Sequence, residues 1–205
     1  MDQKNHRIVL YTAQTDAVLE AIRRDGTCFS REAYIQRKYG ESAPGFLAAY
    51  QWLARAAAEL VPPPPGAELP YWAFHDLHSV EVSGDVSVLT LSVPTEEAVF
   101  FDMYEWIQIL QLRYLGETES ERRSFCRDLE RRGLRESDVM LTRFYPEERR
   151  QVEGSWHRLF RHHHAIQTGD LAGVGSVQAA LWQIKQEWIT ACRPAGGAPP
   201  FSAGQ

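Results

Sequence analysis

The segment 177–189, VQAALWQIKQEWI, contains the side chains best suited to chemistry in this sequence. It mixes large apolar residues with several amides and one carboxylate, Glu187, whereas apolar core segments rarely contain so many amides. A half-buried Glu187 beside a ligand would be a candidate catalytic acid, because burial of an unpaired carboxylate is costly. The alternative is a solvated or capping glutamate. Gln178 and Trp182 of the same segment are candidate ligand-binding residues.

Two polar side chains, Thr12 and Gln14, lie in and just after the apolar stretch IVLYTA near the amino terminus. Their hydroxyl and amide groups could hold a ligand by hydrogen bonds, or they could serve a turn and the cap of a following helix. An aromatic wall on which a planar ligand stacks could be formed by Tyr71, Trp72, Phe74 and Trp106. Core packing explains these residues equally well.

The histidine run at 162–164 does not predict a metal site. Consecutive histidines on a helix point in different directions, and no HExxH spacing is present. We expect solvated histidines at a helix end, where the helix dipole favours cations. Cys28, Cys126 and Cys192 lie far apart and are odd in number, so they indicate neither a disulfide framework nor a zinc cluster.

The first half of the chain predicts strands combined with helices. IVLYTA at 7–13 is rich in branched and aromatic residues and predicts a strand. Thr15 then caps a helix that ends at Gly26. A short strand is expected at 27–30, helices at 31–39 and 43–60, and further strands at 71–77, at 80–83 and after a turn at 83–85.

The second half is predominantly helical by its 3.6-residue pattern, at 99–115 and 120–132, with another helix that begins at Pro146. Asp102 is expected to be a helix N-cap rather than an acid catalyst. The pattern of 177–189 fits both a helix and one face of a strand. Residues 194–205 are expected to form a disordered tail, which leaves one domain over residues 1–193.

Composition and charge restrict the class of protein. With 44% hydrophobic and 24% charged residues, the chain of 205 residues should fold as a globular domain. Its net charge of -5 argues against a DNA or RNA footprint, which requires an excess of Lys and Arg. No apolar stretch approaches the roughly 18 residues of a membrane span, and the amino terminus predicts no export signal. We therefore expect a cytoplasmic protein without membrane association.

Several segments, in the right order, resemble a bacterial family known as domain of unknown function 3841. They are LYTAQ, AYQWL followed by PPPPGAELPYWAF, then VLTLSVPTEEAVFFDMYEW, SWHRLF and finally VQAALWQIKQEWI. Together they cover most of residues 8–190. The resemblance implies membership of the family and no particular activity.

A second resemblance concerns the order of elements. The opening strand LYTAQ, a helix that ends at Gly26, an alanine-rich helix and the strand VLTLSV are similar in layout to small ADP-ribosyltransferase-like domains. This resemblance implies that the opening strand, with Thr12 and Gln14, helps to hold NAD as a co-substrate. It also implies that Glu187 matches the glutamate that stabilises an oxocarbenium-like transition state. The flanking Trp182 and Trp188 would supply a low-dielectric setting.

We therefore expect an α+β fold, in which a small, mainly antiparallel sheet is covered by several helices in a single domain. The functional hypothesis is an ADP-ribosyltransferase-like nucleotide cleft that transfers ADP-ribose from NAD to a macromolecular acceptor without a metal. Two alternatives stay open: a non-catalytic protein-interaction module that uses the Arg/Glu-rich helices of residues 120–161, and a different tailoring or hydrolytic enzyme with the same cleft. In the leading hypothesis Glu187 is catalytic, and the ligand-binding residues are Thr12, Gln14, Trp72, Trp106, Gln178 and Trp182.

Overall fold

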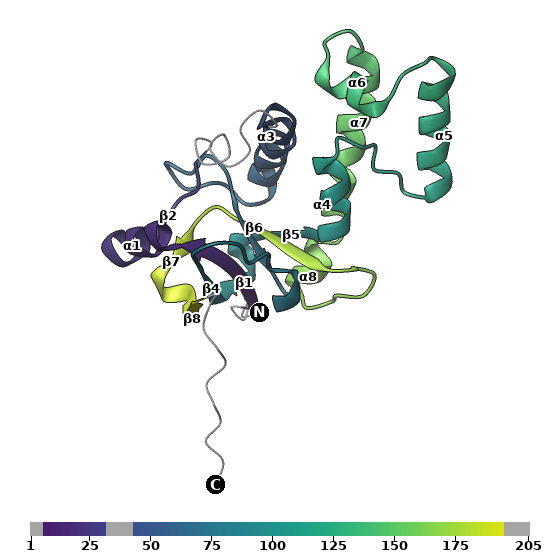
Figure 1. The fold of residues 1–205 in the computed structure, drawn as a ribbon. Coiled ribbons are helices and arrows are strands. Elements are labelled where there is room, and N and C mark those ends of the chain that lie inside the picture. The colour runs from purple at the N-terminus through teal and green to yellow at the C-terminus, as the bar shows by residue number, and fades with distance from the viewer. Residues whose placement is uncertain (1–5, 32–42, 195–205) are drawn as a thin grey trace.

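The structure is a computed structural model that describes residues 6–31 and 43–194 (Figure 1). Six strands form one antiparallel sheet in the order β5-β6-β3-β1-β4-β8, and β2 pairs with β7 in a separate two-stranded sheet. The predicted α+β fold with an antiparallel sheet is confirmed. The strands are β1 (Arg7–Thr15), β2 (Thr27–Cys28), β3 (Tyr71–Phe74), β4 (Val86–Pro94), β5 (Ala98–Asp102), β6 (Val177–Leu181), β7 (Ile184–Lys185) and β8 (Ile189–Pro194).

The helices fall into two groups (Figure 1). Helices α1, α3, α4 and α8 accompany the sheet, whereas α5, α6 and α7 stand together away from it and are called the helical arm below. The α-helices are α1 (Asp16–Asp25), α3 (Ala43–Leu60), α4 (Met103–Leu110), α5 (Glu119–Arg131), α6 (Glu136–Leu141), α7 (Pro146–Trp156) and α8 (His163–Gln167). Short 3-10 helices are η2 (Leu77–Ser79), η3 (Thr95–Glu97), η4 (His157–Phe160) and η5 (Gln186–Trp188).

Two hydrophobic cores lie on the two faces of the sheet. One contains Leu19 and Ile22 of α1 with Ile166 of α8, and the other contains residues of α3, α4 and the arm. Alternate residues of β6 enter different cores, so all five of its residues are buried. A strand buried on both faces lacks polar alternation. This explains why the sequence of 177–189 fits helix and strand alike, although the chain there forms β6, β7 and η5.

Helix α1 follows directly from β1, as predicted. Its amphipathic face buries Leu19 and Ile22, and Gly26 ends it in the left-handed conformation with φ of 76°. Glycine adopts this conformation without a Cβ penalty, and its N–H donates to the carbonyl of Ile22 at 2.8 Å. Thr15 has the extended backbone of an N-cap, but its side chain makes no capping hydrogen bond.

Two predicted elements are wrong, and two other predictions fall outside the described residues. The helix expected from residue 99 begins only at Met103, because Ala98–Asp102 forms β5, again buried on both faces. Asp102 is the N-cap of α4, as predicted, and accepts from the N–H of Tyr104 at 2.7 Å. The strand expected at 80–83 is irregular chain after η2. The helix predicted at 31–39 and the tail predicted at 194–205 lie outside the described residues, apart from Arg31, which is irregular, and Pro194, which ends β8.

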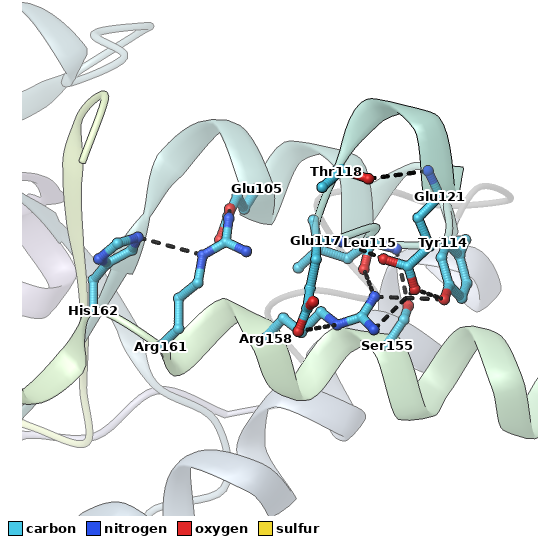
Figure 2. A network of polar contacts seen from close by, with 10 residues as sticks. All are labelled: Glu105, Tyr114, Leu115, Glu117, Thr118, Glu121, Ser155, Arg158, Arg161 and His162. Atoms are coloured by element: carbon cyan, nitrogen blue, oxygen red, sulfur yellow. Dashed lines mark hydrogen bonds and ion pairs between the residues drawn. The ribbon is translucent and has the colours of Figure 1, made fainter. Parts of the chain in front are cut away.

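Charged residues join α5 of the arm to η4 and to the loop after α4, and join the end of η4 to α4 (Figure 2). Arg158 of η4 donates to the carbonyl of Leu115 at 2.7 Å and to Glu121 at 3.0 Å. The hydroxyl of Tyr114 donates to the same carboxylate at 2.6 Å and is the main cause of the lowered pKa of Glu121. Next to this network Arg161 pairs with Glu105 of α4. These half-buried contacts fix the base of the arm.

His163 corrects the expectation that residues 162–164 are all solvated. Its ring is buried between α8 and the edge strand β5, where Nδ1 accepts from the N–H of Phe100 at 3.1 Å. An edge strand has backbone groups without a partner strand, and His163 satisfies one of them. Burial, with a smaller effect of His164, lowers the pKa of His163 to about 4.

We predict that His163 makes the fold sensitive to acid. Because its pKa falls from 6.5 to about 4 on folding, the unfolded chain binds a proton in this window that the folded chain does not. The stability contribution is therefore complete above pH 6.5 and is lost by about pH 4, with an upper bound of about 3 kcal/mol. Urea unfolding at pH 7, 5.5 and 4.5 should show a smaller pH slope for His163→Asn, whose amide oxygen accepts without titrating. Equal slopes would contradict the prediction.

Candidate functional site

The candidate site lies where β1 separates from β3 inside the sheet. Strand β1 pairs with β4 from Arg7 to Thr15, yet it pairs with β3 at a single position, Tyr11 opposite Phe74. Beyond that pair the hydroxyl of Thr12 takes the place of a ladder bond and donates to the carbonyl of Trp72 at 2.7 Å. The side-chain N–H of Gln14 donates to the same hydroxyl at 2.8 Å. A short polar chain thus begins at the divergence of two neighbouring strands.

This divergence forms a pocket of about 240 Å³, called the β1–β3 cleft below. Strands β1 and β3, helix α3 and the irregular chain after η2 contribute to its walls. The lining residues are Thr12, Ala13, Gln14, Ser30, Tyr50, Pro70, Tyr71, Trp72, Phe74, Val80 and Glu81.

Trp72 is held firmly at one wall of the cleft. Its indole N–H donates to the hydroxyl of Tyr50 on α3 at 2.8 Å. Its ring contacts Tyr50 edge-on at 5.1 Å between centroids and Trp106 at 5.2 Å in a tilted arrangement. The indole donor is therefore occupied within the protein, and Trp72 offers a ligand ring surface and van der Waals contact.

The other predicted ligand-binding residues lie in the sheet core. Trp106 and Trp182 are buried, and the indole N–H of Trp182 donates to the carbonyl of Val61 at 2.7 Å. Gln178 is buried on β6 between Phe74 and Phe101 of the neighbouring strands. None of the three belongs to the lining of the β1–β3 cleft. The structure brings together Thr12, Gln14 and Trp72 from the predicted set.

Glu187 lies in a different pocket. It is exposed on η5 and lines a hollow of about 590 Å³, called the η5 pocket below. The η5 pocket shares no lining residue with the β1–β3 cleft. Its lining residues are Asp25, Gly26, Thr27, Gln183, Lys185, Gln186 and Glu187. Trp188 is buried behind Glu187 in the core, whereas the carboxylate itself faces solvent.

The two pockets are nevertheless neighbours along the chain. Thr27 lines the η5 pocket and Ser30 lines the β1–β3 cleft. Because Thr27 and Ser30 are three residues apart, their Cα atoms are separated by at most about 11 Å. Lys185, the basic residue of the η5 pocket, is paired with Glu97 through Nζ at 2.7 Å.

Sequence reasoning missed three polar residues of the cleft: Ser30, Tyr50 and Glu81. Glu81 was assigned to a strand at 80–83, which concealed that irregular chain there brings a carboxylate to the cleft. Tyr50 lies in the helix predicted at 43–60, where it shares an apolar face with Phe46 and Leu53 and was therefore interpreted as a packing residue. No sequence signal available for Ser30 could have placed it here, because its position follows from an isolated bridge to Leu69.

Other parts of the described chain give weaker indications of chemistry. Within residues 6–31 and 43–194, no group of three His, Cys, Asp or Glu side chains is placed to hold a metal ion. In the same ranges no helix is long and apolar enough to span a membrane. The arm's alternating charges form local ion pairs such as Arg149 with Glu153, which is typical of solvated helices. Leu141 and Phe144, 60% and 83% exposed, are its most prominent apolar residues.

Comparison with known proteins places this single α+β domain in a family. Residues 9–190 match the family described as "Domain of unknown function (DUF3841)". The chain belongs to this family, as the ordered sequence segments predicted. Searches among curated proteins and among solved structures found no match.

We predict that the Thr12 hydroxyl stabilises the walls of the cleft. Thr12→Val keeps the side-chain shape but leaves the carbonyl of Trp72 without its donor, which should cost about 1–3 kcal/mol in the free energy of unfolding. Thr12→Ser retains the hydroxyl and should lose less. Urea denaturation of the three proteins measures the difference. A Thr12→Val protein as stable as the unaltered chain would show that another donor serves this carbonyl.

Proposed function

We propose that the β1–β3 cleft binds the nicotinamide end of NAD, and that the protein transfers ADP-ribose from NAD to a macromolecular acceptor. The observation that carries this proposal is the Thr12 and Gln14 pair at the point where the opening strand leaves β3. A cleft against the opening strand is also what the similarity in layout to ADP-ribosyltransferase-like domains implies.

The chemistry of Gln14 suits a carboxamide ligand. One N–H of its amide is used on Thr12, which leaves the second N–H and the carbonyl oxygen for a ligand, since no other partner is found in the described chain. A carboxamide such as that of nicotinamide offers the complementary acceptor and donor. The neighbouring ring of Trp72 supports stacking or edge contact with a planar heterocycle.

The size of the cleft favours one ring rather than a whole dinucleotide. Its volume of about 240 Å³ is below the roughly 300–1,000 Å³ typical of sites for drug-sized ligands. The ribose and phosphates would therefore extend beyond the cleft. Thr27 of the η5 pocket lies within about 11 Å of chain from Ser30 of the cleft, and the proposal requires that the ribose extend toward Glu187 in that pocket.

Glu187 is the acid that we assign to the transfer step. As the bond between nicotinamide and ribose lengthens, positive charge develops on the ribose, and a carboxylate nearby stabilises it. Exposure of Glu187 in the free protein reduces that effect, because water screens charges. The ligand itself would have to exclude water from the η5 pocket.

The alternatives make different predictions. A non-catalytic interaction module would bind a partner through the arm, where Leu141 and Phe144 are exposed, and would show no affinity for NAD. A different tailoring or hydrolytic enzyme would use the cleft for another ligand. We keep the cytoplasm as the proposed compartment, supported by the three free cysteines.

We predict that NAD raises the melting temperature of the protein and that Gln14 contributes to its affinity. Saturation at about 100 times Kd should stabilise the fold by roughly 2.7 kcal/mol. Gln14→Leu should weaken binding about tenfold, the loss expected for one or two hydrogen bonds. Differential scanning fluorimetry and isothermal titration calorimetry measure both effects, with ADP-ribose as the comparison that lacks the nicotinamide ring. No shift with NAD would refute the proposal.

We further predict that Glu187→Gln separates binding from turnover. The substitution removes the charge that stabilises the transition state, so release of nicotinamide from NAD should slow by about 100-fold. The Kd for NAD should change by less than about threefold, because Glu187 lies outside the cleft. Chromatographic assay of released nicotinamide provides the measurement. Full turnover by the Gln variant would remove Glu187 from the mechanism.

A further inference from the structure

We infer that the β1–β3 cleft selects a cationic ring over a neutral ring of the same shape. This inference rests on the proposed function, and it deepens it by assigning a charge to the group that enters the cleft. The residue that makes the selection is Glu81, helped by the aromatic residues of the walls.

The first observation that supports this inference is the negative charge of the cleft. Among the described residues that line it, Glu81 is the one ionisable side chain apart from the tyrosines, and no Lys, Arg or His is present. Glu81 is exposed and lines the cleft, and it forms no ion pair with any residue in the described ranges. A concave site with one unpaired carboxylate creates a negative potential, which attracts cations and repels phosphates.

The aromatic residues of the cleft walls also favour a cationic ring. Four rings line the cleft: Tyr50, Tyr71, Trp72 and Phe74. Aromatic faces carry negative charge density, so a cation close to them is attracted, and sites rich in such rings bind quaternary nitrogen groups. A neutral ring gains the same apolar contact but lacks this electrostatic attraction.

Different elements bring Glu81 and the aromatic rings into the lining of one site. Trp72 and Phe74 lie on β3, Tyr50 on α3, and Glu81 in the irregular chain between η2 and β4. Thr12 and Gln14 lie on β1 and complete the polar side of the cleft. A ring whose amide meets Gln14 therefore lies within a pocket whose one charged side chain among the described lining residues is an anion.

NAD and NADH provide the direct test, because they share the adenosine and both phosphates and differ at the nicotinamide ring. That ring is a pyridinium cation in NAD and a neutral dihydropyridine in NADH. Isothermal titration calorimetry on the full chain should give a Kd for NAD at least about tenfold lower than that for NADH, as a cation-π and carboxylate site would produce.

Two variants assign the selection to Glu81. Glu81→Gln should weaken NAD binding about fivefold or more and leave the Kd for NADH unchanged. Asp85→Asn removes a carboxylate four residues further along, outside the cleft lining, and should leave both Kd values unchanged. Circular dichroism and melting temperature check that each variant is folded. Equal affinities for NAD and NADH, or an equal loss of both in Glu81→Gln, would overturn the inference and leave the proposed function standing.

Single-ring ligands separate failure of the inference from failure of the proposed function. If neither dinucleotide binds, the proposed function falls, and 1-methylnicotinamide and nicotinamide then test charge selection alone. Tighter binding of cationic 1-methylnicotinamide, with loss of that preference in Glu81→Gln, supports the inference. Equal binding of the two rings, or binding of neither, overturns it.

Discussion

The hydroxyl of Thr12 bonded to the carbonyl of Trp72 is the contact on which the candidate site depends. In a continuous antiparallel sheet that carbonyl would accept from a neighbouring backbone N–H. Here β1 and β3 separate after Tyr11 and Phe74, and a partly buried carbonyl without a donor would be costly. The hydroxyl of Thr12 donates to this carbonyl at 2.7 Å and removes the cost. The sheet can therefore contain a cleft and still satisfy its backbone.

Pairing with the outer neighbouring strands keeps β1 and β3 apart. Strand β1 is paired along its full length with β4, while every residue of β3 is paired with β6. The six-stranded sheet thus consists of two well-paired halves, β5-β6-β3 and β1-β4-β8, joined at one register position. Strands β5, β6 and β3 contribute to the cores on both faces, whereas β1, β4 and β8 contribute only to the core that contains α1 and α8. Closing the cleft would require one half of the sheet to move relative to the other.

Sequence patterns predicted the elements whose structure is determined by residues close together in the chain. The β1–α1–Gly26 unit was predictable because alternation, amphipathic spacing and a left-handed glycine all agree. Strands β5 and β6 were not, because burial on both faces removes the alternation that distinguishes strand from helix. His163 was assigned to solvent for a similar reason: its partner, the N–H of Phe100, lies 63 residues away in sequence. Thr12, Gln14 and Trp72 were identified by residue type, whereas Glu81 required knowledge of tertiary structure.

The relation between the two pockets follows from the turn that ends α1. The carbonyl of Gly26 accepts from the N–H of Gln186 at 2.9 Å, and β2 then pairs with β7. The same turn therefore fixes η5, which carries Glu187, and directs the chain through Thr27 to Ser30 at the cleft. Since α1 begins where β1 ends, one continuous segment from Thr12 to Ser30 determines the position of Glu187 relative to the polar pair on β1. A substitution with a Cβ at Gly26 would strain the φ of 76° and alter this geometry while leaving every proposed ligand contact chemically intact.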